Sequence, residues 1–383
     1  MTEISLYNLS PALSVMLTGL IIAVGPLLWV GIKSRNAPAT QRLRMLTWVT
    51  LFLTFDLVIF GAFTRLTDSG LGCPDWPGCY GSASPLGAAV HIDAAQTALP
   101  SGAVTFPKAW IEMIHRYLAT GVGALILVLA TWSWLERKKI SVSPWWPTLT
   151  LLWVCMQGAF GALTVTMKLF PAIVTLHLLG GMTLLALLKV QSVRYAQAIG
   201  ESRRHQVPAG TWWLMLTTFG LLWLQIALGG WVSTNYAVMA CTDFPACQNS
   251  MWPLMNFSEG FTLWRELGAG RNGDNISFQA LTAIHYVHRL SAYVVFAAIA
   301  LLTFKLFKVK ALRVPAKWLA GLALLQAATG LGNVLLGWPL LAAVMHTGGA
   351  AGMVVVLTGI VVSSQSVVSA SAAHFSTARG LRA

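Results

Sequence analysis

Charge is what this sequence has least of. Asp, Glu, Lys and Arg make up 10% of the 383 residues, whereas hydrophobic residues make up 56%. Soluble domains average about 25% charged residues, so this chain has too little charge to cover a water-facing surface. We therefore expect lipid to surround most of it. Helices are the expected form, because lipid offers no partner to a bare N–H or C=O group.

Apolar runs of about 20 residues, long enough to cross a bilayer as helices, recur along the chain. Residues 1–10 contain no Lys or Arg. The basic start of a signal peptide is therefore missing, and we expect the first run to be a retained helix. The expected spans are 11–31, 46–66, 109–135, 146–167, 172–191, 212–234, 281–306, 316–337 and 340–364.

Acidic residues are also few, 12 against 25 Lys and Arg, which gives a net charge of +13. The distribution of the basic residues argues against a nucleic-acid partner. Every second loop is basic, as with Arg42 and Arg44 between the first two spans and Arg194 between the fifth and sixth. This is the positive-inside pattern of membrane proteins. It predicts an outer N-terminus, a cytoplasmic C-terminus and membrane lipid as the main partner.

Cysteine is rare, and four of the five cysteines lie in two copies of one pattern, Cys-x-Asp-aromatic-Pro-small-Cys. The copies are "CPDWPGC" at 73–79 and "CTDFPAC" at 241–247, both in loops predicted to face outward. A disulfide between Cys73 and Cys79 would close a short loop stiffened by prolines. The alternative is thiol–disulfide exchange as a redox step. We favour the structural role.

The Cys pattern is one part of a longer repeat. "IEMIHR" at 111–116 is echoed by "AIHYVHR" at 283–289, and a glutamine precedes a histidine by 20 residues in both 157–177 and 326–346. Spans two to five thus repeat as spans six to nine. We predict two four-helix bundles related by a pseudo-twofold axis along the membrane normal, plus one extra N-terminal helix. The corresponding domains are 1–45, 46–210 and 211–383.

Four histidines occupy equivalent depths within these spans. His115 and His177 belong to the first repeat, and His288 and His346 belong to the second. Histidine inside a membrane is costly and usually functional, and helical bundles build cofactor sites from facing helices. Two imidazoles on opposite faces of a flat ring suit haem iron. Copper or zinc would need further ligands, so haem is favoured.

The two repeats differ beside these histidines. Glu112 lies one turn before His115, whereas His285 occupies that place in the second repeat, and Arg65 is replaced by Ser233. A desolvated carboxyl can exchange protons near neutral pH. We therefore predict a catalytic role for Glu112; the alternative is that it only orients His115. For His285 we predict no ligand role.

Three arginines lie near the outer boundary of the spans: Arg65, Arg116 and Arg289. Arg116 and Arg289 each follow a candidate ligand directly. Because guanidinium groups pair well with carboxylates, these arginines are candidates to bind haem propionates. The alternative is that they extend toward water.

Together these features resemble the haem A synthase family. The resemblance covers about residues 46–364, and the close match of its first two stretches suggests the proteobacterial branch. It is carried by "GAFTRLTDSGLGCPDWPGC" (61–79), "EMIHR" (112–116), "TLHLLGG" (175–181), "VHRL" (287–290) and "MHTGGA" (345–350). The family usually has eight helices, whereas this chain has a ninth run before the repeat.

The resemblance implies oxidation of haem O to haem A for cytochrome oxidase, by conversion of the C8 methyl to a formyl group. It implies that haem O, the substrate, is bound in the first repeat and that a haem b cofactor is held in the second. It also implies a bacterial inner membrane, a periplasmic N-terminus and haem O synthase as a partner. The electron donor is unknown, and a homo-oligomer is possible. The family's residues map as follows: Glu112, His115 and His177 at the substrate side, His288 and His346 at haem b, and Cys73, Cys79, Cys241 and Cys247 as external cysteines.

Three other functions compete with this one. A dihaem b-type cytochrome exchanging electrons with quinone explains the paired histidines but not Glu112. A thiol-oxidising protein explains the external cysteines only. A transporter explains only the repeat.

Overall fold

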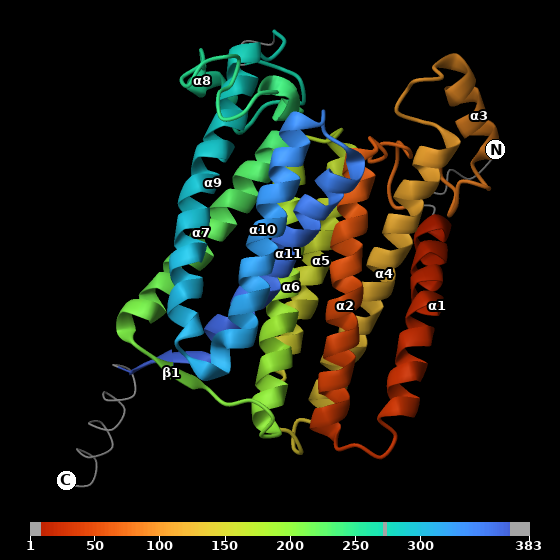
Figure 1. The fold of residues 1–383 in the computed structure, drawn as a ribbon. Helices are drawn as coiled ribbons and strands as arrows, with labels where there is room; N and C mark the ends of the chain where they lie inside the picture. Colours follow the sequence, from red (N-terminus) through yellow and green to blue (C-terminus); the bar gives the residue numbers. More distant parts are fainter. Residues whose placement is uncertain (1–8, 271–273, 368–383) are drawn as a thin grey trace, which may run out of the picture. The chain divides into compact units, whose positions relative to one another are not determined.

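The structure is a computed structural model that describes residues 9–270 and 274–367, and it is almost entirely helical (Figure 1). Within those residues, nine helices are long and apolar enough to cross a membrane, which confirms the all-α prediction and the number of spans. The prediction about the first ten residues falls largely on 1–8, outside the described part. The nine are α1 (Ser10–Lys33), α2 (Ala39–Leu66), α4 (Phe106–Leu135), α5 (Trp145–Thr166), α6 (Pro171–Ala198), α7 (Ala209–Thr234), α9 (Phe278–Phe307), α10 (Arg313–Leu335) and α11 (Leu340–Val362).

Several helices extend beyond the apolar runs that predicted them. Helix α2 begins at Ala39, directly after Pro38, and α6 continues to Ala198. Helical hydrogen bonding need not stop where hydrophobicity stops, because water also tolerates a helix. Arg42, Arg44 and Arg194 therefore lie in helical ends, and their predicted placement in loops was wrong.

Shorter elements were not predicted from the sequence. They are α3 (Ala89–Ala98), α8 (Phe257–Gly260), the 3₁₀ helices η1 (Ala237–Ala240) and η2 (Lys310–Leu312), and the strands β1 (His205–Val207) and β2 (Ser364–Ser366). The two strands pair in parallel, with His205 opposite Ser364 and Val207 opposite Ser366. They are too short to show a period-2 pattern in the sequence.

The chain divides into two compact units. The first consists of Met1–Leu184 and Leu263–Ala269. In it, α4 packs against α1, α2, α3 and α5, and Figure 1 shows α1 running beside α4. Glycines allow the close approach of these two helices: a Cβ on Gly19 would lie 2.5 Å from Thr120, and one on Gly121 would lie 3.1 Å from Ile22. The extra helix is thus tightly bound to the helix that carries Glu112 and His115.

The second unit consists of Leu185–Thr262 and Gly270–Ala383. In it, α7 packs against α9 and α11, and α10 packs against α9 and α11. Helix α9 has a hydroxyl N-cap, in which the Ser277 side chain accepts from the N–H of Ala280 at 3.2 Å. Thr105 caps α4 in the same way, so the two helices with the His-Arg pairs begin alike. The domain boundaries 46–210 and 211–383 and the pseudo-twofold axis stay predictions.

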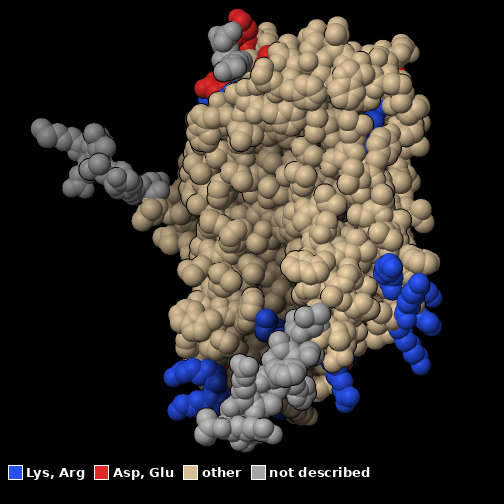
Figure 2. Space-filling model, turned by 90° about the vertical axis from the view of Figure 1, so that its left-hand side faces the viewer, with Lys and Arg blue, Asp and Glu red and all other residues tan. Residues whose placement is uncertain are grey.

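Charged side chains are unevenly distributed on the molecular surface drawn in Figure 2. The face drawn in Figure 2 has a broad band without Lys, Arg, Asp or Glu, and Lys and Arg gather below it. Such a band is what a bilayer core requires. The structure therefore supports a multi-pass membrane protein.

Candidate functional site

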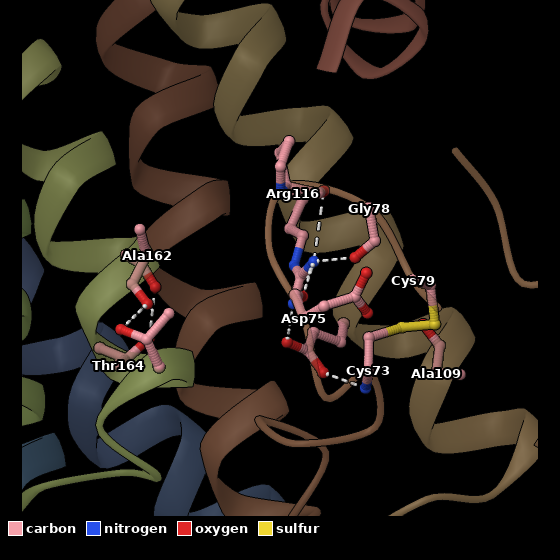
Figure 3. Close-up of polar contacts among 12 residues, drawn as sticks. Cys73, Asp75, Gly78, Cys79, Ala109, Arg116, Ala162 and Thr164 are labelled. Carbon is pink, nitrogen blue, oxygen red and sulfur yellow. Dashed lines mark hydrogen bonds and ion pairs between the residues drawn. A yellow bond between two sulfur atoms is a disulfide. The ribbon is translucent and has the colours of Figure 1, made fainter. Parts of the chain in front are cut away.

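The first Cys loop, residues 73–82, follows α2. Its disulfide joins Cys73 and Cys79 with an S–S distance of 2.06 Å, which confirms the predicted pairing (Figure 3). The Asp75 carboxylate accepts from the backbone N–H of Tyr80 at 2.6 Å and of Gly81 at 2.8 Å. The aspartate of the motif thus ties the two sides of the loop together.

The second Cys loop, residues 241–250, has the same construction. A disulfide joins Cys241 and Cys247. The Asp243 carboxylate accepts from the N–H groups of Gln248 at 2.8 Å and Asn249 at 2.9 Å. Hydrogen bonds from Asn249 and then Gln248 hold the pKa of the Asp243 carboxyl below its ordinary value. The sequence echo therefore reflects one loop structure used twice.

An arginine from the adjacent helix anchors each loop. Nη1 of Arg116 donates to the carbonyls of Asp75 at 2.9 Å, Pro77 at 3.2 Å and Gly78 (Figure 3). Nη1 of Arg289 donates to the carbonyls of Asp243 at 3.0 Å, Pro245 at 3.3 Å and Ala246 at 2.6 Å. Both arginines are buried. These contacts supply a role that sequence reasoning missed, and propionate binding by either arginine stays a prediction.

The acceptor beside each arginine differs between the units. In the first, the buried Glu112 accepts from Nη2 of Arg116 with one carboxylate oxygen and from the N–H of Cys73 at 2.8 Å with the other. In the second, His285 lies at 3.0 Å from the carbonyl of Ala237 through Nδ1, and its Nε2 lies 3.5 Å from Arg289. Glu112 thus ties the first Cys loop to α4 through one oxygen and pairs with Arg116 through the other, one turn before His115.

The extra helix α1 covers the first Cys loop. Val15 of α1, both cysteines of this loop, Ile92 of α3 and Met113 of α4 form one buried cluster. Pro11 also touches the loop, since a Cβ on Gly78 would lie 3.0 Å from the Pro11 side chain. The second loop is covered by Tyr286 and Met255 instead.

Arg65 lies at the end of α2, where it forms an ion pair with Asp68 at 3.3 Å. The ion pair is more exposed on the Asp68 side, at 56%, than on the Arg65 side, at 14%. The sequence-based role of Arg65 in binding the substrate stays a prediction.

Each of the four histidine rings lies against a glycine of a neighbouring helix. A Cβ added to Gly61 would lie 3.0 Å from Nε2 of His115, and a Cβ added to Gly229 would lie 2.9 Å from Cε1 of His288. The same holds for Gly161 with His177 at 3.6 Å and Gly330 with His346 at 3.3 Å. The glycines recur at the spacing of the repeat. Aligning the two halves of the sequence reveals this recurrence, but the prediction of the ligands used the histidines alone.

The histidines of one unit also lie close to each other. His177 lies close enough to His115 for the charge of one ring to act on the other, and the same is true of His346 and His288. Each of the four histidine residues is partly buried. The structure therefore brings together the two members of each predicted pair.

The polar contacts of these rings differ between the units. In the second unit, Nε2 of Gln225 lies 3.1 Å from Nδ1 of His288 and donates to its carbonyl at 3.1 Å. The Thr329 hydroxyl lies 2.9 Å from Nδ1 of His346. In the first unit, Phe60 stacks on His115 with ring centroids 6.3 Å apart, and the buried Nδ1 of His177 has no hydrogen-bond partner.

Gln157 and Gln326 also need glycine neighbours. A Cβ on Gly180 would lie 1.8 Å from the Gln157 amide nitrogen, and a Cβ on Gly349 would lie 2.3 Å from that of Gln326. Gln326 donates to the carbonyl of His346 at 2.7 Å. The small-residue runs around these positions therefore serve side-chain placement as well as helix packing.

The donor sets fit haem better than a bare metal ion. No group of three or more His, Cys, Asp or Glu in the described part of the chain could hold a metal. Each unit instead offers two imidazoles whose rings lie against glycines, and two such ligands suffice for haem iron. His115 and His177 would hold one haem, and His288 and His346 the other.

Known proteins resemble this chain over most of its length. Residues 44–358 match the COX15-CtaA family, described as cytochrome oxidase assembly protein. A protein of Shewanella oneidensis named heme A synthase is 37% identical over 322 residues, 82% of this chain and 95% of that protein. One of the same name from Mesorhizobium japonicum is 29% identical over 324 residues, 79% of this chain and 84% of that protein.

A third relative, from Alkalihalophilus pseudofirmus and also named heme A synthase, is 25% identical over 215 residues, 56% of this chain and 67% of that protein. The family match begins after α1 and includes every predicted histidine ligand and all four loop cysteines. The chain belongs to the cytochrome oxidase assembly protein family COX15-CtaA.

Proposed function

We propose that this chain is an oxidoreductase that converts haem O to haem A for cytochrome oxidase. The relatives are named for this synthesis, and the family is one of cytochrome oxidase assembly. The observation that carries the proposal is the pairing of four partly buried imidazoles, each against a glycine, with an acid beside only one pair. One pair can then hold a substrate and the other a redox cofactor.

The first unit is the proposed substrate side. His115 and His177 would hold haem O, and Glu112 lies one turn from His115 with both oxygens engaged by Arg116 and the N–H of Cys73. These two hydrogen bonds fix the position of the Glu112 carboxylate. A general base must be held in place in this way to accept a proton from the bound substrate. The first Cys loop thereby positions a group that acts one helical turn away. The reaction oxidises the C8 methyl through a hydroxymethyl stage to a formyl group.

The second unit is the proposed cofactor side. A haem b held by His288 and His346 would supply reversible one-electron chemistry. The chain's contribution there is to position the ligands. The Thr329 hydroxyl contacts the His346 ring, and the Gln225 and Gln326 amides donate to the backbone carbonyls of His288 and His346. His285 takes the place of Glu112, so this unit has no carboxylate beside its histidine pair.

The proposed location is the bacterial inner membrane, with the N-terminus in the periplasm and the C-terminus in the cytoplasm. The basic residues at one end of the apolar band support this orientation (Figure 2). Two disulfides at the other side suit an oxidising compartment. Haem O synthase would supply the substrate, a donor outside this chain would exchange electrons with haem b, and a homo-oligomer is compatible with these roles.

Glu112→Gln tests the assignment of the acid. Gln keeps an oxygen for the N–H of Cys73 but removes the carboxylate. Cells making haem O would express each variant, and the haems extracted from membranes would be separated by chromatography. We expect Glu112→Gln to keep the haem of the second unit and to lose most haem A, a fall of about 10²–10⁴-fold for a lost acid–base group.

Ser258→Ala, a substitution at an exposed position of the short helix α8, is the control for expression. Full haem A production by Glu112→Gln would show that the carboxylate has no chemical role. Haem b alone in cells that express the unsubstituted chain and contain haem O would favour the dihaem cytochrome instead.

A further inference from the structure

The contacts of Thr329 determine which nitrogen of His346 carries the proton. The Thr329 hydroxyl lies 2.7 Å from the carbonyl of Leu325 and 2.9 Å from Nδ1 of His346. A carbonyl can only accept, so the single hydroxyl proton goes to Leu325. Nδ1 of His346 must then be the donor to the hydroxyl oxygen. A neutral imidazole with its proton on Nδ1 leaves the lone pair on Nε2 free.

This chain of hydrogen bonds is characteristic of a histidine prepared as a ligand. Ligating histidines usually donate their second ring N–H to a protein acceptor, which fixes the ring orientation and raises its basicity. Thr329 is buried, and it lies on α10 directly before Gly330, the glycine that faces His346. The ring is thus held by a hydrogen bond at one side and by close packing at another.

The first unit lacks this arrangement at the equivalent place. "QGAFG" at 157–161 corresponds to "QAATG" at 326–330, so Phe160 stands where the second unit has Thr329. Phenylalanine offers no acceptor, and Nδ1 of His177 is buried without a hydrogen-bond partner. The packing is also looser, because a Cβ on Gly161 would lie 3.6 Å from Cε1 of His177, against 3.3 Å for Gly330 and His346.

The difference matters because the two units have different tasks, a point that rests on the proposed function. A cofactor is kept through many turnovers, whereas a substrate must enter and its product must leave. Loss of such an outer hydrogen bond typically lowers metal affinity about 10–100-fold. An unsupported His177 also has to be ordered when it binds iron, which costs rotamer entropy.

We propose that Thr329 is a positioning residue that makes the second unit retain its haem, and that Phe160 at the equivalent place allows the first unit to release its product. In the same unit the Gln225 amide contacts His288 and donates to its backbone carbonyl, and Leu57 stands at the equivalent place on α2. Neither ligand of the first unit therefore has the polar side-chain neighbour found in the second.

The test measures haem retention with Thr329→Val, which removes the hydroxyl at nearly constant shape, and Thr329→Ser, which restores it. Both are made in a His115→Ala/His177→Ala background, so that only the haem of the second unit is observed. Purified protein is mixed with apomyoglobin, and the transfer of haem is followed by absorbance. The midpoint potential is measured by redox titration.

We expect Thr329→Val to transfer its haem about 10–100-fold faster than the background protein and to have a higher midpoint potential, since a less basic ligand favours ferrous iron. Thr329→Ser should match the background protein in both. Unchanged transfer and potential in Thr329→Val would overturn the role of Thr329, because a purely structural hydroxyl would not move the potential.

The second half of the proposal is tested with Phe160→Thr in the full chain loaded with haem A. We expect slower transfer of haem A to apomyoglobin, and Phe160→Leu serves as the control for lost volume. Equal rates for the Thr and Leu variants would overturn the role of Phe160. Haem retention in the second unit is measured without haem A production, so the two proposals can fail separately. If the chain makes no haem A but Thr329→Val still loses its haem faster, the proposed function is refuted and the positioning role of Thr329 is supported.

Discussion

Arg116 provides a direct measure of how strongly the first Cys loop is held. Arg116→Met keeps much of the side-chain volume but removes the donor to three loop carbonyls and the cation beside the buried Glu112. Removing one partner of a buried ion pair typically costs about 3–5 kcal/mol, because a charge stays buried and unpaired. Each 1.4 kcal/mol is about tenfold in an equilibrium constant. Opening of the loop should therefore rise by about a hundredfold to several thousandfold.

Arg289 gives a matched comparison. Its substitution by Met removes the same kind of carbonyl contacts, but the neighbouring group is His285, which is not an anion in either protonation state. The expected cost is that of hydrogen bonds to a charged donor, about 1.5–3 kcal/mol. The effect of Arg289→Met on the second loop should thus be smaller than the effect of Arg116→Met on the first.

The assay is the rate at which each disulfide becomes reducible. Protein in membranes is treated with a phosphine reductant, thiols are alkylated, and mass spectrometry distinguishes the Cys73–Cys79 peptide from the Cys241–Cys247 peptide. The second disulfide is an internal control for Arg116→Met, and the free Cys155, which is exposed, controls for labelling. Equal acceleration of both disulfides, or none, would refute the idea that Arg116 holds one specific loop.

Two further predictions concern the second unit. Gly229→Ala would place a methyl carbon 2.9 Å from Cε1 of His288, so the purified protein should lose most of its low-spin haem absorbance. The control is Gly220→Ala on the same helix, where the added methyl meets nothing within 4 Å and the absorbance should be retained. Equal spectra for the two variants would contradict the packing argument. Hydrogen bonds from the backbone of Asn249 and then of Gln248 lower the pKa of Asp243. The ionised carboxylate therefore stabilises the second Cys loop at pH values above the unfolded pKa of about 3.9. This stabilisation is lost as the pH falls through the lower pKa of the folded state. Reduction of the Cys241–Cys247 disulfide should therefore become faster below about pH 4. In Asp243→Asn the reduction should already be faster at pH 7 and should not change with acid. Parallel pH profiles for the two proteins would refute the role of the Asp243 carboxylate.

The sequence alone determined the parts of the protein that depend on composition and order. Long apolar runs require helices in lipid whatever their neighbours are, so nine spans could be predicted from residues 11–364. A repeat is a property of order, so the pairing of the Cys loops and of the four histidines was visible without a structure. The ends of the helices were not, because polar turns such as those with Arg42 and Arg194 carry no apolar signal.

The tertiary structure decided what each polar side chain contacts. Arg116 and Arg289 were candidates for a propionate or for water, yet their Nη1 atoms donate to loop carbonyls. That outcome depends on a loop folding back over the helix, a long-range contact with no local pattern. The same holds for Thr329, since its distance to His346 is set by the close packing of α10 on α11 at a glycine. Composition and order fix which segments enter the membrane, whereas partners across helices follow from packing, which joins residues that are remote in sequence.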